Sequence, residues 1–508
     1  MIRRLWRLSN RLIRMVLSSL FGALVVIIIL GVVQLNRQPD LSVWHKAELD
    51  EEFRANSGLN SFDEYLELED RLFEQLDRLV YQEIDEKDQR EINRYHRGSL
   101  SDPDRWPTNW NRSFVLPVDR PVAGILLLHG MSDSPYSMRS IGQALHGQGA
   151  HVIGMRVPGH GQAPSGLIDI DWQDMAAAVR LAMDEIQEVA TGLPLYIVGY
   201  SNGAALAVQY TLDSLTDDKL KVVDGLILMS PEIGVTKLAA LAKWQERLGH
   251  LLGLEKLAWN SIQPEYDPWK YGSFALNAGK QAYLITQEIQ GQITALTKSG
   301  ELDQMPPILA FQSVVDSTVT APALVHNLFD RLSAFASGPD NPHQTHHELV
   351  LFDINRWAEI EPIMNEDPSA WIDSMLQKTD TKYMVTLMSN MSPDNNKIVA
   401  FSRAPGSLDV ETCDTGLSWP EGVYSLSHVA LPMPADDPVY GGEAAGASAG
   451  IELGNLALRG EKGVLRVPAA DMLRLRHNPF HGYMLHRVSV FLGLESVPSG
   501  FCIPSDTA

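Results

Sequence analysis

A serine framed by two glycines is the residue pattern in this chain best suited to chemistry. Gly199-Tyr200-Ser201-Asn202-Gly203 follows the apolar run Leu195–Val198 and precedes an alanine-rich segment that extends to about Leu215. A buried strand, then G-x-S-x-G, then a helix is typical of a nucleophile elbow, in which small residues permit a turn sharp enough to present the hydroxyl above a sheet. The alternative is a turn whose glycines serve packing alone. We expect Ser201 to be a nucleophile.

An activated serine needs a base and an acid that orients the base. On a fold with such an elbow, the chain order is serine, acid, histidine. Asp316 follows an apolar run, 308–311, and is the expected acid, although an aspartate in this position can also be a helix N-cap. His428 comes after the run Leu349–Phe352, which we expect to be the last main strand, and is the expected base.

Other histidines fit the order less well. A group of three precedes Leu349–Phe352 and would lie at the amino end of that strand, whereas the site should lie at the carboxyl ends. His129 precedes the nucleophile and is expected to be structural. The three histidines before the strand are His343, His346 and His347.

The developing oxyanion needs two backbone N–H donors. The residue after the nucleophile, Asn202, supplies one of them. The other is expected from the loop after an early strand. Leu128-His129-Gly130-Met131 forms that loop, so Met131 is the second candidate.

Alternating strands and helices must position these groups. Apolar runs over 125–128, 152–155, 225–229 and 308–311 alternate with helical patterns between residues 121 and 354. This rhythm predicts a mostly parallel α/β sheet with helices on both faces. Functional side chains should then gather at the carboxyl ends of the strands.

Further segments flank or interrupt this core. A helical extension is expected over 35–120. The aromatic-rich segment 232–305 lies between two predicted strands, so we expect a helical cap over the strand ends. A second insertion at 355–420 should contain a strand pair, Tyr383–Met388 and Lys397–Phe401. Residues 421–508 should supply the histidine loop and a C-terminal helix.

The N-terminus carries a targeting signal. Met15–Val33 contains no charge and is long enough to span a bilayer, so 15–34 is expected to be a transmembrane anchor. Arginines in 1–14 keep that end cytoplasmic and place the catalytic domain on the outer, extracytoplasmic side. A cleaved signal peptide is the alternative. Two cysteines, Cys413 and Cys502, could be paired or free.

Charge excludes one class of partner. The net charge of −22 and a pI near 5.1 argue against a nucleic-acid partner, because an acidic surface repels phosphates. The oligomeric state is not indicated by any pattern in the sequence.

Four motifs together resemble a known superfamily. H-G-M-S-D-S-P-Y-S-M-R (129–139), R-V-P-G-H-G (156–161), G-Y-S-N-G (199–203) and S-V-V-D-S-T-V (313–319) look like the α/β-hydrolases. The most similar branch contains monoacylglycerol lipases, lysophospholipases and carboxylesterases, often labelled serine aminopeptidase S33. The resemblance implies a Ser–Asp–His triad, two oxyanion amides and a cap.

The expected function is therefore a membrane-anchored serine hydrolase that cleaves carboxylic esters, with a small-molecule or lipid ester as substrate. No organic cofactor and no metal is implied. An amidase, peptidase or thioesterase would use the same groups. A non-enzymatic binding protein on a hydrolase fold is the other alternative, because a fold does not dictate a function.

Overall fold

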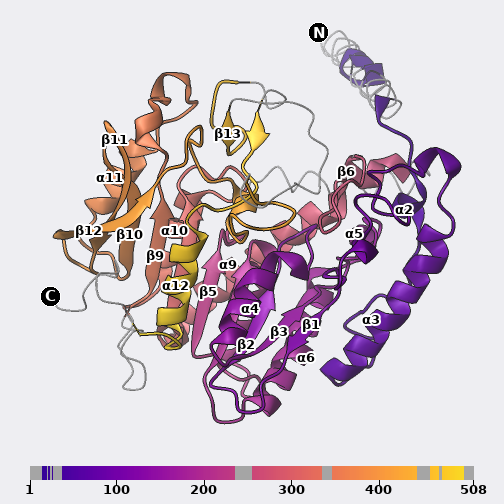
Figure 1. Ribbon diagram of the computed structural model, residues 1–508, viewed down its shortest axis with the longest axis horizontal. Helices are drawn as coiled ribbons and strands as arrows, with labels where there is room; N and C mark the ends of the chain where they lie inside the picture. The colour runs from indigo at the N-terminus through magenta and orange to yellow at the C-terminus, as the bar shows by residue number, and fades with distance from the viewer. Residues whose placement is uncertain are drawn as a thin grey trace, which may run out of the picture.

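A long twisted sheet forms the centre of the protein (Figure 1). The computed structural model describes residues 14–19, 21–22, 26, 37–234, 255–334, 346–442, 458–467 and 472–496. Across these residues, ten strands pair in the order β1-β3-β2-β4-β5-β8-β9-β10-β11-β12. Their bounds are β1 Phe114–Leu116, β2 Gly124–Leu128, β3 His151–Met155, β4 Leu195–Tyr200, β5 Gly225–Met229, β8 Ile308–Ser313, β9 Glu348–Phe352, β10 Met384–Ser392, β11 Asn395–Arg403 and β12 Val410–Ser418.

The strands from β3 to β10 in this order run parallel, whereas β1 pairs antiparallel with β3 and β10–β11–β12 pair antiparallel. Every residue of β2, β3, β4, β5, β8 and β9 is buried. Continuous apolar runs therefore mark these strands, as expected for a parallel sheet that is covered on both faces.

Helices cover both faces. On one face, α4 (Arg139–Gly147) and α12 (His481–Phe491) pack on one set of strand side chains. The opposite face carries α6 (Trp172–Val189), α7 (Asn202–Ser214), α9 (Leu276–Ser299) and α10 (Ala321–Asn327). The α/β architecture predicted from the sequence is confirmed.

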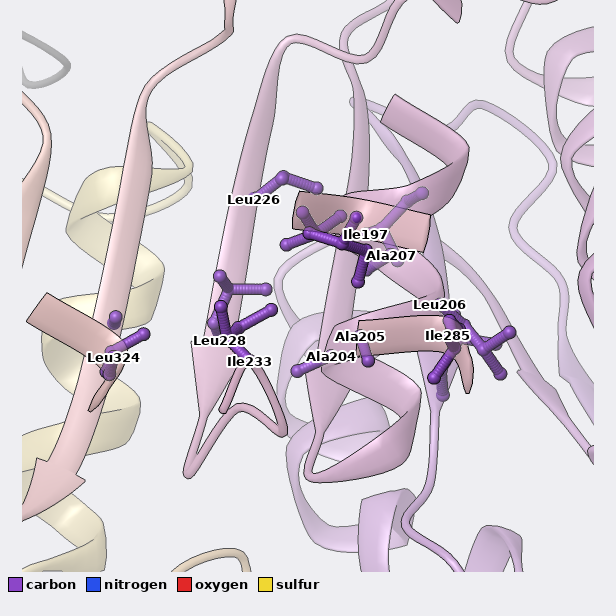
Figure 2. Packing of buried hydrophobic residues seen from close by; sticks show 14 of the residues in the cluster. Ile197, Ala204, Ala205, Leu206, Ala207, Leu226, Leu228, Ile233, Ile285 and Leu324 are labelled. Atoms are coloured by element: carbon purple, nitrogen blue, oxygen red, sulfur yellow. The ribbon is translucent and has the colours of Figure 1, made fainter. Parts of the chain in front are cut away.

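The second of these faces is tightly packed around the nucleophile helix. Figure 2 shows Ile197 of β4 and Leu226 and Leu228 of β5 beside the alanines of α7. Small residues on α7 let the helix approach the sheet closely, so it is buried along almost its whole length.

The prediction of a cap over 232–305 is wrong for the second half of that range. Helix α9 belongs to the layer on the sheet, with Ile285, Ile289 and Ile293 fully buried beside α7. The crossover from β5 must return to the adjacent parallel strand β8, and α9 forms that crossover. Residues 235–254 lie outside the described residues. Before α9, the described residues also form a short antiparallel pair, β6 (Trp259–Ser261) and β7 (Phe274–Ala275).

The prediction that 355–420 forms an insertion separate from the sheet is also wrong. Strand β10 pairs in parallel with β9, and β11 and β12 continue the same sheet. The strand pair itself is confirmed and is longer than predicted. Leu349–Phe352 is consequently not the last main strand. These strands lie at one end of the sheet, opposite the N-terminal segment (Figure 1). Helix α11 (Ser369–Leu376) precedes β10.

The segment before the core is less helical than expected over 35–120. It contains α2 (Val43–Lys46) and α3 (Phe62–Leu76), and its last part forms β1, so the central sheet begins before residue 121. Helix α3 packs against α6. No helix among the described residues is long and apolar enough to cross a membrane. Most of the predicted anchor at 15–34 lies outside the described residues.

A buried cluster of ion pairs connects the N-terminal segment to the core. The Arg156 guanidinium is fully buried and donates to Glu52 at 2.9 and 3.0 Å and to Glu69 at 2.9 Å. Glu52 also accepts the Gly159 N–H at 2.7 Å. Each buried charge thus has a partner from the other segment, as burial of charge requires.

Candidate active site

Ser201 occupies a strained turn between β4 and α7. Its φ of 54° and ψ of −116° are rare for a residue with a side chain, and only 6% of the residue is exposed. Gly203 makes the turn sterically feasible, because a Cβ there would lie 2.2 Å from the Leu128 carbonyl oxygen. The close approach of β2 therefore requires the glycine, and the elbow geometry predicted from G-x-S-x-G is confirmed.

The structure brings the three predicted side chains together. Ser201 Oγ lies 3.0 Å from His428 Nε2, and His428 Nδ1 lies 2.8 Å from Asp316 Oδ2. His428 opens a short 3₁₀ turn, His428–Ala430, beyond β12, whereas Asp316 follows β8. Residues far apart in the sequence thus form one hydrogen-bonded chain at the carboxyl end of the sheet. This arrangement can move a proton from the hydroxyl to the imidazole.

Asp316 is held in a tight polar turn. Its Oδ1 accepts the N–H groups of Thr318 and Val319 at 2.8 and 2.9 Å, and Gln312 Nε2 donates to Oδ2 at 3.1 Å. Burial alone would raise the pKa of the carboxyl, but the neighbouring imidazole and the two N–H groups outweigh it and lower the pKa below its usual value. Asp316 is therefore ionised at neutral pH and can orient the imidazole.

Two backbone N–H groups are the predicted donors to the oxyanion. Asn202 is the first residue of α7, and Met131 lies in the loop after β2. Within the described chain, neither N–H donates a hydrogen bond to another protein group. Amides left unpaired beside a reactive hydroxyl can accommodate a developing negative charge.

A short loop from the predicted cap covers this region. The Tyr271 N–H donates to the Ser132 carbonyl oxygen at 2.9 Å, and Lys270 Nζ lies 3.6 Å from Asp133 Oδ2. Trp269 stacks on Tyr136 with ring centroids 4.8 Å apart. The loop between β6 and β7 therefore contacts the loop that carries Met131.

His129 and His347 lie outside the hydrogen-bonded chain of Ser201, His428 and Asp316. His129 accepts the Val157 N–H at Nε2, 3.0 Å away, and burial lowers its pKa well below the usual value. His347 precedes β9, and burial lowers its pKa to about 4. His346 adjoins it, and His343 lies outside the described residues. None of the described members of that cluster reaches Ser201 by a hydrogen bond.

Sequence reasoning missed a buried carboxyl beside the nucleophile. Glu232 follows β5, and its N–H donates to the Ser201 carbonyl oxygen at 3.2 Å. Its Oε2 is buried and has no hydrogen-bond partner among the residues that the structure describes. Burial raises the pKa of this carboxyl to about 7, although attraction to His428 opposes the shift. Its position directly after a parallel strand was the available signal.

Cys413 of β12 is disulfide-bonded, and Cys502, the other cysteine of the chain, lies outside the described residues. In the described part of the chain, no cluster of three or more His, Cys, Asp or Glu side chains is arranged to hold a metal ion.

Comparison with known families agrees with this geometry. Residues 119–349 match the family model described as serine aminopeptidase, S33. The chain is a serine hydrolase of the α/β-hydrolase superfamily. The matched range covers under half of this hydrolase. It includes Ser201 and Asp316 but ends within β9, so His428 and the three-strand extension of the sheet lie outside it.

Solved structures similar to this hydrolase include lipases. One comes from work on LipS and LipT, two metagenome-derived lipolytic enzymes, with 18% identity, 44% of this chain and 83% of that chain covered, and a TM-score of 0.34. A monoacylglycerol lipase from Paleococcus ferrophilus has 16% identity, 47% and 87% coverage, and a TM-score of 0.34. A soluble variant of monoglyceride lipase from Saccharomyces cerevisiae has 14% identity, 47% and 82% coverage, and a TM-score of 0.35. No curated protein sequence matches the hydrolase.

Proposed function

We propose that this hydrolase cleaves carboxylic esters through an acyl-enzyme intermediate, with Ser201, His428 and Asp316 as its catalytic triad. The observation that supports the proposal is the chain of hydrogen bonds from Ser201 Oγ to His428 Nε2 and from His428 Nδ1 to Asp316 Oδ2. A nucleophile, a base and an orienting acid in this order are the minimum set for acyl transfer.

In the proposed mechanism, Ser201 Oγ attacks the ester carbonyl while His428 accepts its proton. The N–H groups of Met131 and Asn202 donate to the oxyanion of the tetrahedral intermediate. His428 then protonates the leaving alcohol, and the intermediate collapses to the acyl-enzyme. Water, deprotonated by His428, attacks the acyl-enzyme and releases the acid. Asp316 remains ionised throughout and stabilises the imidazolium.

We also propose that residues 15–34 anchor the enzyme in a membrane, with the N-terminus cytoplasmic and the catalytic domain outside. The support is the uncharged run Met15–Val33, preceded by a cluster of arginines. An enzyme tethered at a bilayer surface meets acyl esters of lipids at high local concentration, so we infer a lipid or other acyl ester as substrate.

The triad proposal is tested with a fluorophosphonate probe and a panel of acyl esters, amides and thioesters. Ser201→Ala and His428→Ala should each lower ester turnover by about 10³-fold or more, and Ser201→Ala should abolish labelling. His347→Ala is the matched control, because this buried histidine lies away from the nucleophile, and it should retain most activity. Near-normal turnover in folded Ser201→Ala would overturn the proposal. Faster cleavage of amides than of esters would favour a peptidase or amidase instead.

The membrane proposal is tested separately by adding protease to spheroplasts. Digestion of the catalytic domain, together with a mature protein that keeps its arginine-rich start, is the expected result. A soluble product that begins near residue 35 would contradict the anchor.

A further inference from the structure

The loop that carries His428 follows β12, which lies four places along the sheet from β8, the strand that Asp316 follows. In the sequence, β9 is followed by α11 and the strands β10, β11 and β12 before the chain returns to His428. Something other than a short loop must therefore hold the imidazole against Asp316. Productive geometry in a catalytic site has to be fixed within about 0.5 Å, which requires locked supporting contacts.

One buried carboxylate joins the two loops. Glu461 Oε2 accepts the backbone N–H of His428 at 2.6 Å, and Glu461 Oε1 accepts the Ser317 hydroxyl at 3.0 Å. Ser317 directly follows Asp316, so this carboxylate bridges the base and the turn of the acid. Glu461 is 1% exposed, and such a carboxylate forms strong, directional hydrogen bonds.

The backbone of Glu461 is bound to the same loop. Its N–H donates to Ser425 Oγ at 3.1 Å, and its carbonyl oxygen accepts the Tyr424 hydroxyl at 2.8 Å. With the His428 N–H, three hydrogen bonds therefore connect one residue to the segment 424–428. The loop cannot shift without breaking several of them.

A small separate sheet carries this carboxylate. Glu461 directly follows β13 (Arg459–Gly460), which pairs in parallel with β14 (Leu473–Arg474). Figure 1 shows β13 in yellow, away from the strands of the main sheet. Arg474 donates to Glu461 Oε1 at 3.0 Å and supplies the counter-charge that a buried carboxylate requires.

We propose that Glu461 is the positioning residue of the triad: it fixes the His428 loop on the Asp316 turn and, with Arg474, sets the charge around the imidazole. This inference rests on the proposed triad. It assigns a role to a segment, 458–474, that lies outside the matched family range.

The charged and titratable groups that face His428 come from several elements. Asp316 follows β8, Glu232 follows β5, and Glu461 follows β13. The Tyr200 ring lies 5.4 Å from the imidazole, and Arg474 acts through Glu461. Removing the negative charge of Glu461 leaves Arg474 unbalanced and disfavours the imidazolium, whereas removing Arg474 has the opposite effect.

The test compares Glu461→Gln, Glu461→Ala and Arg474→Gln in the full-length enzyme. Glu461→Ala should lower kcat by about 10-fold to 100-fold with little change in KM, because the imidazole is misplaced while the substrate site is not. Glu461→Gln keeps an acceptor and should recover much of kcat. The acidic limb of the pH profile of kcat/KM should move to lower pH in Glu461→Gln and to higher pH in Arg474→Gln.

Arg476→Gln is the control, because Arg476 pairs with Asp267 at 3.3 Å and has no hydrogen bond to Glu461 or His428. It should leave kcat and the pH profile unchanged. All variants are first shown by thermal melting to be folded. The inference is overturned if Glu461→Ala keeps wild-type kcat, or if Glu461→Gln and Arg474→Gln leave the acidic limb unshifted. Equal shifts in the same direction would also overturn it. Activity that persists in Ser201→Ala would instead refute the triad proposal, so the two failures are distinguishable.

Discussion

Replacing Glu232 by glutamine should change how the stability of the enzyme depends on pH. This carboxyl is buried next to the nucleophile, and its Oε2 has no partner within the described parts of the chain. Burial raises its pKa from 4.5 to about 7. Ionising Glu232 therefore costs more free energy in the folded state than in the unfolded state. A difference of about 2.5 pKa units corresponds to about 3 kcal/mol of unfolding free energy.

The sign follows from the raised pKa. Below pH 4.5 the carboxyl is neutral in both the folded and the unfolded state, so its full contribution to stability is present. As the pH rises towards 7, the unfolded chain ionises first and folding loses stability, until the loss is complete above pH 7. Glutamine cannot ionise. The stability of Glu232→Gln relative to the parent should therefore rise by about 3 kcal/mol between pH 4.5 and pH 8.

The assay is denaturant unfolding at pH 4.5, 6, 7 and 8, in an inactive Ser201→Ala background so that activity plays no part. Glu188→Gln is the control, because Glu188 is exposed on α6. A constant offset between Glu232→Gln and its parent at all four pH values would refute the reasoning, since it would mean that the native carboxyl is solvated or paired. The informative quantity is how the difference in unfolding free energy between Glu232→Gln and its parent changes with pH. A buried glutamine amide without hydrogen bonds also destabilises the fold, but by an amount that does not depend on pH.

Two further substitutions test the framework around the site. Gly203→Ala should reduce soluble yield and lower the melting temperature by several degrees, because the added Cβ would lie 2.2 Å from the Leu128 carbonyl oxygen. An unchanged melting temperature and turnover would show that the elbow tolerates a side chain. Glu52→Ala should lower the free energy of unfolding in urea by about 3–5 kcal/mol, because it removes one carboxylate partner of the buried Arg156 guanidinium. Glu67→Ala, on the exposed side of α3, is the control and should have little effect. Equal losses in both variants would contradict a buried ion cluster.

Local patterns in the sequence were sufficient for much of the core. The run 225–229 was predicted with the bounds that the structure gives to β5, because a fully buried strand leaves a continuous apolar run in the sequence. Ser201 was found for a related reason, since the elbow needs small residues at fixed spacing.

Contacts between distant segments were not predictable in the same way. Glu461 and Glu52 lie in stretches without a motif, and the hydrogen bonds that connect them to His428 and to Gly159 span 33 and 107 residues of sequence. The sheet extension was missed for another reason. The pairing of β10 with β9 in parallel depends on the path of the intervening chain, which the composition of 355–383 does not indicate.

The distance in sequence between the three triad positions has a consequence for biosynthesis. Ser201 and Asp316 emerge from the ribosome well before His428, and Glu461 and Arg474 follow later still. At typical elongation rates, roughly 10 to 30 s separate the appearance of Asp316 from that of Arg474. During this interval, the nascent chain already holds its nucleophile but has no base to activate it. If the proposed triad is correct, an enzyme made in this order becomes reactive only near the end of translation, and a chain that stops before the histidine loop should not hydrolyse esters.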